Sequence, residues 1–188
     1  LVINGNNHTI DFQKKYFEAD PTSSQNESFT INDLNMYGYS WWGPVTIKGS
    51  KPKDGIDHSV VFNNVTYTGA QLMYGIYTKA FIKGNTKIQS VGSYVSPLDG
   101  STQTTQGLGN QQNFQISYLE VLPGATYTGT TTGGTNVEVY DGGSFIVDKG
   151  ATVNLQRTDA SKSNERGTNA LIDTQGGNVE FKDGSTVI

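Results

Sequence analysis

Hydrophobic residues occur along this chain as short runs of β-branched or aromatic side chains, separated by Gly, Asn and Asp. Typical runs are residues 29–31, 60–62, 80–82 and 145–147, each with one outward side chain between two inward ones. Helical periodicity is almost absent from the pattern. Strands of a β-sandwich usually run to about five or six residues. The shorter runs of this chain therefore favour a solenoid built from stacked coils.

The spacing of these runs is clearest in the C-terminal part. Val137, Phe145 and Val153 lie eight residues apart, and the same spacing returns at Leu171, Val179 and Val187. Three strand–turn units at this spacing make a coil of about 24 residues, which lies in the range of known repeat architectures. The sequence therefore predicts an all-β fold, a right-handed parallel β-helix (β-solenoid).

Asparagine recurs directly after an apolar triplet. Asn4, Asn32 and Asn63 occupy this position, and Asn85 is a fourth candidate. Asn tolerates left-handed backbone angles, and stacked Asn side chains can hydrogen-bond from one coil to the next. The pattern favours a structural ladder of Asn side chains over a metal or ligand site.

Three polar stretches interrupt the rhythm, at residues 14–27, 97–112 and 157–169. Insertions in a solenoid emerge as loops on one face, which is often the binding face. Because no linker separates two halves, we expect a single domain over residues 1–188 with three polar loop insertions.

Composition narrows the class of protein. Of the 188 residues, 34% are hydrophobic and 16% are charged, with ten Tyr, eight Phe and no Cys. The formal net charge is −4 and no basic stripe stands out, which argues against a nucleic-acid partner. No apolar run of roughly 18 residues is present, so we expect no membrane insertion. The chain begins and stops inside strand-like motifs, which favours a fragment of a longer polypeptide.

Catalytic chemistry has little support in the sequence. A pectate lyase needs an acidic Ca²⁺ site and a basic residue, usually Arg, but this chain has only Arg157 and Arg166, both near one polar stretch. A hydrolase needs paired carboxylates. Asp11 and Asp33 are candidates for neighbouring coils, although turn or surface roles suit them better. We therefore expect no catalytic residue, no metal site and no cofactor.

His8 and His58 do not change this expectation. They lie far apart in the sequence and have no Ser or Cys motif beside them, so neither is typical of a catalytic triad. Structural roles are expected for both.

Aromatic residues carry the main binding signal. Their rings stack on the C–H faces of sugars, while hydroxyl and ammonium groups make polar contacts. The candidates lie in two segments, and they are Tyr37, Tyr39, Trp41 and Trp42 in the first and Tyr74, Tyr77 and Lys79 in the second. If the ligand is acidic, Arg157, Lys162 and Arg166 are candidates to pair with its carboxylates. A buried structural role for some of these rings, and simple solvation of the polar stretch, remain the alternatives.

Two segments resemble a known family. Residues 1–12 (LVINGNNHTIDF) and 61–67 (VFNNVTY) are similar to the pectate-lyase-like adhesive domains of lactobacilli and related Gram-positive bacteria, and most similar to the binding region of serine-rich repeat adhesins. The likeness is clearest up to about residue 96. It implies a right-handed β-solenoid on a secreted, wall-anchored bacterial surface protein that binds plant or host polysaccharide, pectin-type chains included, in a manner that can depend on pH. No binding residue of the family is carried over to this chain.

Three functions follow from these observations. The first is a non-catalytic cell-surface adhesin domain whose partners are polysaccharides or glycoprotein glycans, with pectin-like acidic glycans favoured. The second is a lyase or hydrolase on the same fold. The third is a passive stalk or biofilm segment that self-associates. The acidic balance of the chain also suggests a pH switch, in which protonated Asp and Glu side chains loosen a loop.

Overall fold

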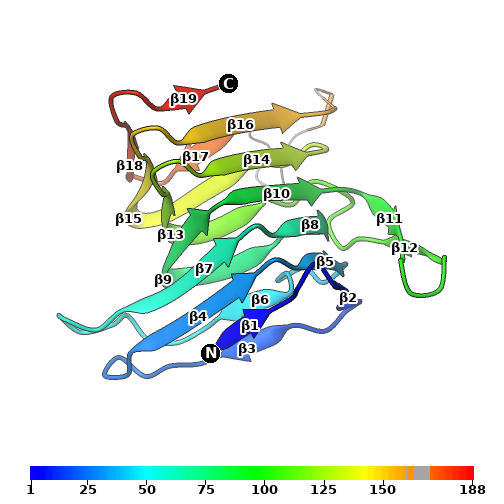
Figure 1. Cartoon of the computed structure of the whole chain (residues 1–188), viewed down its shortest axis with the longest axis horizontal. Helices are drawn as coiled ribbons and strands as arrows, with labels where there is room; N and C mark the ends of the chain where they lie inside the picture. The colour runs from blue at the N-terminus through cyan, green and yellow to red at the C-terminus, as the bar shows by residue number, and fades with distance from the viewer. Residues whose placement is uncertain (160, 163–169) are drawn as a thin grey trace.

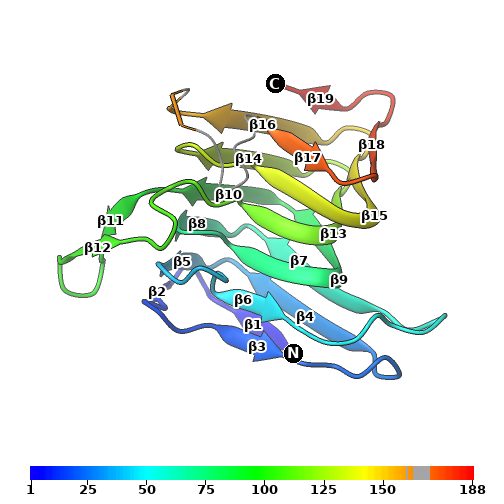
Figure 2. The ribbon, with the colours of Figure 1, turned by 180° about the vertical axis from the view of Figure 1, so that it is seen from behind.

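The chain winds into a stack of coils whose strands run parallel from one coil to the next (Figure 1). The structure is a computed structural model, and it describes residues 1–159, 161–162 and 170–188. Colour changes steadily along the stack, so each coil lies beside the one that follows it, and the two termini lie at opposite ends (Figures 1 and 2). The predicted all-β parallel β-helix is confirmed.

Each coil contributes strands to three faces, which we name A, B and C. Face A contains β1 (Val2–Asn4), β4 (Glu27–Asn32), β7 (His58–Asn63), the second halves of β9 (Met73–Lys83), β13 (Phe114–Val121) and β15 (Val137–Val147), and β18 (Asn178–Phe181). Face B contains β3 (Phe17–Ala19), β6 (Val45–Ile47), the first halves of β9, β13 and β15, and β17 (Ile172–Thr174).

Face C contains β2 (Thr9–Asp11), β5 (Asn35–Gly38), β8 (Thr66–Gly69), β10 (Asn85–Ser90), β14 (Thr126–Thr131), β16 (Thr152–Arg157) and β19 (Thr186–Val187). A separate antiparallel hairpin, β11 (Ser93–Val95) and β12 (Thr102–Thr104), projects from the end of this face (Figure 1). No helix in the described residues is long and apolar enough to cross a bilayer.

The corner between faces B and A differs from the sequence-based expectation. Strands of three or four residues were predicted, but β9 and β15 each span 11 residues. These strands turn the corner without a break, and the register shifts between Ile116 and Tyr118 of β13. Such an irregularity bends a strand and increases its local twist. Two predicted runs therefore merge into one strand that serves both faces.

The predicted eight-residue spacing marks three faces of one coil. Val137 lies on face B, Phe145 on face A and Val153 on face C, and all three are fully buried. In the next coil they pair with Ile172, Val179 and Val187. The first partner is Ile172 and not the predicted Leu171. Val137, Phe145 and Val153 belong to one continuous apolar core, and Ile172 packs against it. Val179 and Val187, in the last coil, are exposed.

The Asn ladder forms along the turn after face A. Asn32 Nδ2 donates to Asn4 Oδ1 at 2.9 Å, and Asn63 Nδ2 donates to Asn32 Oδ1 at 3.0 Å. The prediction is wrong for Asn85, because Lys83 pairs with Asn63 in the next coil. The backbone N of Asn85 instead donates to Asn64 Oδ1 at 2.9 Å.

The predicted loops are only partly loops. Residues 14–27 contain β3, and residues 97–112 contain β12 of the hairpin. The stretch from 157 begins with the last residue of β16, and most of it, from 163 to 169 and at 160, lies outside the described residues. A fourth connection, residues 48–57 between β6 and β7, was not predicted.

Candidate functional site

A surface groove follows the corner between faces B and A; we call it the corner groove. It consists of two adjoining cavities that share Tyr77. One is lined by Ile47, Lys48, Gly49, Tyr74, Ile76 and Tyr77. The other is lined by Lys51, Pro52, Tyr77, Lys79, Ser117, Tyr118 and Gly143. The groove therefore combines the bend of β9 and β13 with the connection over residues 48–57.

Tyr77 occupies the bend itself. Its φ of 73° lies in the left-handed region, which is unfavourable for a bulky residue and marks strain that the surrounding structure must hold. The next residue, Thr78, is fully buried, and its carbonyl accepts a hydrogen bond from Ser117 Oγ at 3.3 Å. This anchoring keeps the Tyr77 side chain between the two cavities.

Trp42 and Tyr74 form a ring pair at the face B end of the groove. Their centroids are 4.8 Å apart with an interplanar angle of 64°, and Trp42 is 41% exposed. The turn that carries Trp42 is tightly fixed. Gly43 has a φ of 79°, and a Cβ there would lie 2.5 Å from the carbonyl oxygens of Gln71 and Leu72. Only glycine fits at position 43. The Trp42 indole, next to it in the sequence, is exposed to solvent.

Phe81 and Tyr118 form a second ring pair on face A, with centroids 5.9 Å apart. The Tyr118 hydroxyl donates to Glu120 Oε2 at 2.6 Å. Burial, together with this bond to a carboxylate, raises the pKa of the Tyr118 phenol, and burial also raises the pKa of the Glu120 carboxyl. Tyr118 therefore stays a neutral phenol, and its hydroxyl donates a hydrogen bond to the Glu120 carboxylate.

Three lysines lie along the groove, and two of them are in ion pairs. Lys48 Nζ lies 2.7 Å from Glu18 Oε2, and Lys79 Nζ lies 2.5 Å from Asp57 Oδ1. Among the described residues Lys51 has no ion pair. The groove thus places ammonium groups next to aromatic rings.

Beyond Tyr74 the outer side of face B becomes polar. Gln115 pairs in register with Tyr74 on one side and Glu138 on the other. Glu138 is fully buried and accepts hydrogen bonds from Gln115 Nε2 at 3.4 Å and Gln175 Nε2 at 2.9 Å. These amides solvate the carboxylate in place of water. We assign this group a structural role.

The predicted site residues divide into three places. Tyr74, Tyr77 and Lys79 line the corner groove, and Trp42 lies next to it, with its ring packed against that of Tyr74. Tyr37, Tyr39 and Trp41 lie toward face C and support the hairpin. The Tyr37 ring lies 5.5 Å from that of Tyr94, the Tyr39 carbonyl accepts from the Gln106 amide at 3.0 Å, and the Trp41 amide donates to Gln106 Oε1 at 2.5 Å.

The predicted basic cluster occupies the third place. Arg157 Nη2 donates to the carbonyl of Lys162, at the end of β16 on face C. Arg166 lies outside the described residues. Neither Arg157 nor Lys162 lines the corner groove.

The acidic and histidine candidates have structural partners. Asp11 accepts from the Tyr94 hydroxyl at 2.8 Å and from Ser96 Oγ at 2.6 Å, and Asp33 accepts from Asn64 Nδ2 at 3.0 Å. His58 is buried, with Nε2 3.1 Å from the carbonyl of Gln25. Within the described ranges, no three His, Cys, Asp or Glu side chains gather as a metal site would require.

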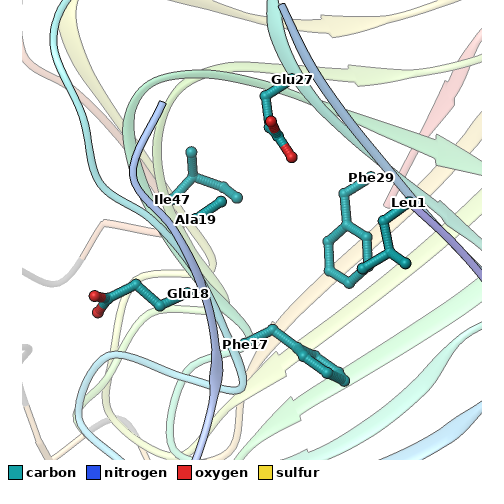
Figure 3. A pocket seen from close by; sticks show the side chains of 7 residues that line it. All are labelled: Leu1, Phe17, Glu18, Ala19, Glu27, Phe29 and Ile47. Carbon is teal, nitrogen blue, oxygen red and sulfur yellow. The ribbon is translucent and has the colours of Figure 1, made fainter. Parts of the chain in front are cut away.

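A further cavity opens at the first coil (Figure 3). Phe17, Phe29 and Ile47 line it with apolar side chains, and the rings of Phe17 and Phe29 have centroids 5.6 Å apart. The carboxylate of Glu18 points away from its centre (Figure 3). Its apolar walls are core side chains of the solenoid, so it is not our candidate site.

Sequence reasoning did not single out Lys48, Lys51 or Tyr118 of the groove, nor Phe81, whose ring packs against Tyr118. Alternation offered a signal for two of them. Phe81 and Tyr118 each precede an inward residue, Ile82 and Leu119, so both rings were expected to point outward. For the lysines no local signal exists, because residues 48–57 reach the groove only through the coil geometry.

The sequence and the fold of this chain both have matches among known proteins. Residues 1–74 match a family model described as a pectate lyase-like adhesive domain. A solved structure described as L. reuteri 53608 SRRP, a Lactobacillus reuteri serine-rich repeat protein, superposes with a TM-score of 0.74 at 16% identity, covering 100% of this chain and 65% of that chain. No curated protein matches. The predicted resemblance to pectate lyase-like adhesive domains is thus confirmed over residues 1–74, and the fold of the serine-rich repeat protein is shared over the whole chain.

Proposed function

We propose that this chain is a single adhesin domain of a bacterial cell-surface protein, and that it binds polysaccharide in the corner groove without cutting it. Pectin-like acidic glycans are the favoured ligands. The observation that carries the proposal is the gathering of Tyr74, Tyr77 and Tyr118 beside lysines in one groove, with the exposed Trp42 ring packed against Tyr74. The match of residues 1–74 to an adhesive family model supports it.

Recognition follows from the chemistry of the two ring pairs. Exposed ring faces stack on the C–H faces of sugars, and phenol hydroxyls make hydrogen bonds. Lysine ammonium groups form charge-assisted hydrogen bonds with uronate carboxylates. Tyr74 and Tyr118 lie on neighbouring coils, which are about 4.8 Å apart. An extended acidic chain fits such alternation of rings and positive charge.

The proposal of binding without catalysis rests on the carboxylates near the groove. A glycosidase needs two carboxyl groups that face one bond of the substrate. Glu18 and Asp57 are the carboxylates paired with groove lysines, and they lie at opposite cavities, on β3 and before β7.

The test is binding of a short oligogalacturonate, measured by calorimetry with groove variants. Trp42→Ala and Tyr74→Ala should each weaken binding roughly three- to tenfold, since a ring contact contributes about 0.5–1.5 kcal/mol. Trp41→Ala is the matched control, because Trp41 lies beside Gln106 toward face C, whereas the Trp42 ring packs against the groove residue Tyr74. The Trp41→Ala variant should bind like the unaltered protein. Equal losses for Trp41→Ala and Trp42→Ala would contradict the assignment of the groove.

The remaining functions are separated by two further measurements. Steady release of unsaturated product from polygalacturonate, with or without Ca²⁺, would establish a lyase. A glycan array from acidic to neutral pH tests the range of ligands and the proposed pH dependence, and equal binding at pH 4 and pH 7 would remove the latter. If no glycan binds at any pH, the role as a stalk or self-associating segment gains.

A further inference from the structure

Lys79 is the groove lysine with the closest internal partner. It lies just past the bend of β9 and lines the cavity that also contains Lys51 and Tyr118. Its Nζ is 2.5 Å from Asp57 Oδ1, while the side chains of Lys79 and Asp57 remain 44% and 63% exposed. A solvent-exposed pair of this kind usually contributes no more than about 1 kcal/mol. The ion pair between Lys79 and Asp57 can therefore be replaced at little cost by an ion pair between Lys79 and a ligand carboxylate.

The backbone of Asp57 is held in place without help from its carboxylate. The Asp57 amide donates to Asn26 Oδ1 at 2.9 Å, and its carbonyl accepts from the Glu27 amide at 3.0 Å. Two residues later Ser59 pairs in register with Lys79 of the next coil. The stacking of the two coils thus places the Asp57 carboxylate beside Lys79. There it occupies the position that we expect for an acidic group of a ligand.

The other cavity of the groove has the same arrangement. Lys48 lies at its rim and is paired with Glu18 of β3 at 2.7 Å. Two of the three groove lysines are therefore paired with a carboxylate of the protein itself, one in each cavity.

We infer that Asp57 is an internal competitor that occupies Lys79 until a ligand carboxylate displaces it. This inference rests on the proposed function of the groove and names its specificity-determining contact. A neutral polysaccharide cannot exchange with Asp57 and gains nothing from Lys79. An acidic one recovers the lost ion pair through its own carboxylate and adds ring contacts to Tyr77 and Tyr118. Because a ligand must displace Asp57, anions that interact only through their charge bind more weakly. Polymers that present both a carboxylate and a sugar face are favoured.

The experiment compares Asp57→Asn with Asp54→Asn in calorimetric titrations with a short oligogalacturonate. Both variants remove one negative charge from the connection over residues 48–57, but among the described residues Asp54 has no ion pair. We expect Asp57→Asn to tighten binding roughly two- to fivefold and Asp54→Asn to change it much less. In a Lys79→Gln background the gain from Asp57→Asn should disappear. Binding of a fully methyl-esterified oligomer should be the same in all variants.

The outcomes separate the two levels of the proposal. If the unaltered protein binds and Lys79→Gln weakens binding, but Asp57→Asn and Asp54→Asn behave alike, the competitor role of Asp57 is wrong and the groove assignment stands. If Asp57→Asn tightens binding equally with Lys79 or Gln at position 79, general charge and not exchange at Lys79 is responsible, and the inference fails. If no variant binds oligogalacturonate, both the inference and the acidic-glycan function are overturned.

Discussion

Tyr77 is the residue where backbone and binding surface depend on each other. Its left-handed φ of 73° occurs in the middle of β9, where the strand passes from face B to face A. Left-handed angles cost a side-chain-bearing residue roughly 1–2 kcal/mol relative to the right-handed region. Glycine would adopt this conformation without strain. A tyrosine in this place is consistent with the role that we propose for its ring in the groove.

Tyr77→Gly should therefore separate stability from binding. We expect the free energy of unfolding to stay within about 1 kcal/mol of its original value, because relief of backbone strain offsets the loss of ring contacts and the added chain entropy. Oligogalacturonate binding should fall at least about threefold. Denaturant unfolding and calorimetry measure the two quantities. A variant that keeps full affinity would show that the ring serves the bend alone.

Side chains that link one coil to the next stabilise the elements in register. The Asn ladder does so along the turn after face A. Nearer the C-terminus, Lys182 Nζ lies 2.5 Å from Asp148 Oδ1, whose side chain is only 8% exposed. The hydrogen bond from Lys182 lowers the pKa of the Asp148 carboxyl below its ordinary 3.8. Glu120, with a raised pKa, and Glu180 are the neighbouring acids.

Lys182→Gln should make the protein less stable at neutral pH, with a loss that depends on pH. A carboxyl whose folded-state pKa is lowered stabilises the fold fully above its ordinary pKa, and this contribution disappears as pH falls through the lowered value. The difference in unfolding free energy between the two proteins should thus be constant near pH 7 and shrink below about pH 4. Lys149→Gln, which changes the exposed lysine directly after Asp148, is the control. A difference that persists unchanged to pH 2 would show that Asp148 is not its source.

At the scale of the whole molecule, one core runs through all the coils. Phe62 on face A is fully buried, and its ring centroid lies 5.8 Å from that of Phe114 on face B. Each coil contacts chiefly its neighbours, as in other solenoids, so stability is approximately a sum of coil and interface contributions. A cavity in a central coil weakens two interfaces at once.

Phe62→Ala should cost about 3–5 kcal/mol, the usual range for a buried phenylalanine. Phe81→Ala, which removes an outward ring from the neighbouring strand, should cost much less because water already reaches that surface. Guanidinium unfolding of both variants checks the contrast. Similar losses for the two would mean that the outer side of face A is packed as tightly as the core.

The sequence by itself determined the fold and much of its local chemistry. Strand identity depends on alternation among neighbouring residues, and a turn depends on Asn or Gly at one position, so the eight-residue spacing and most of the Asn ladder were readable from the chain. The strand lengths were not, because the register shift near Tyr118 merges two predicted runs at a corner.

Only the tertiary structure decided which rings and charges share one site. Tyr74, Tyr77 and Lys79 line the groove and Trp42 packs against Tyr74. Tyr37, only five positions before Trp42, contacts Tyr94 of the hairpin instead. Asp57 and Lys79 are 22 residues apart, and they meet because that separation is close to one coil. The register shift at the corner and the pairing of neighbouring coils bring such residues together, and both depend on the stacking of each coil on its neighbours.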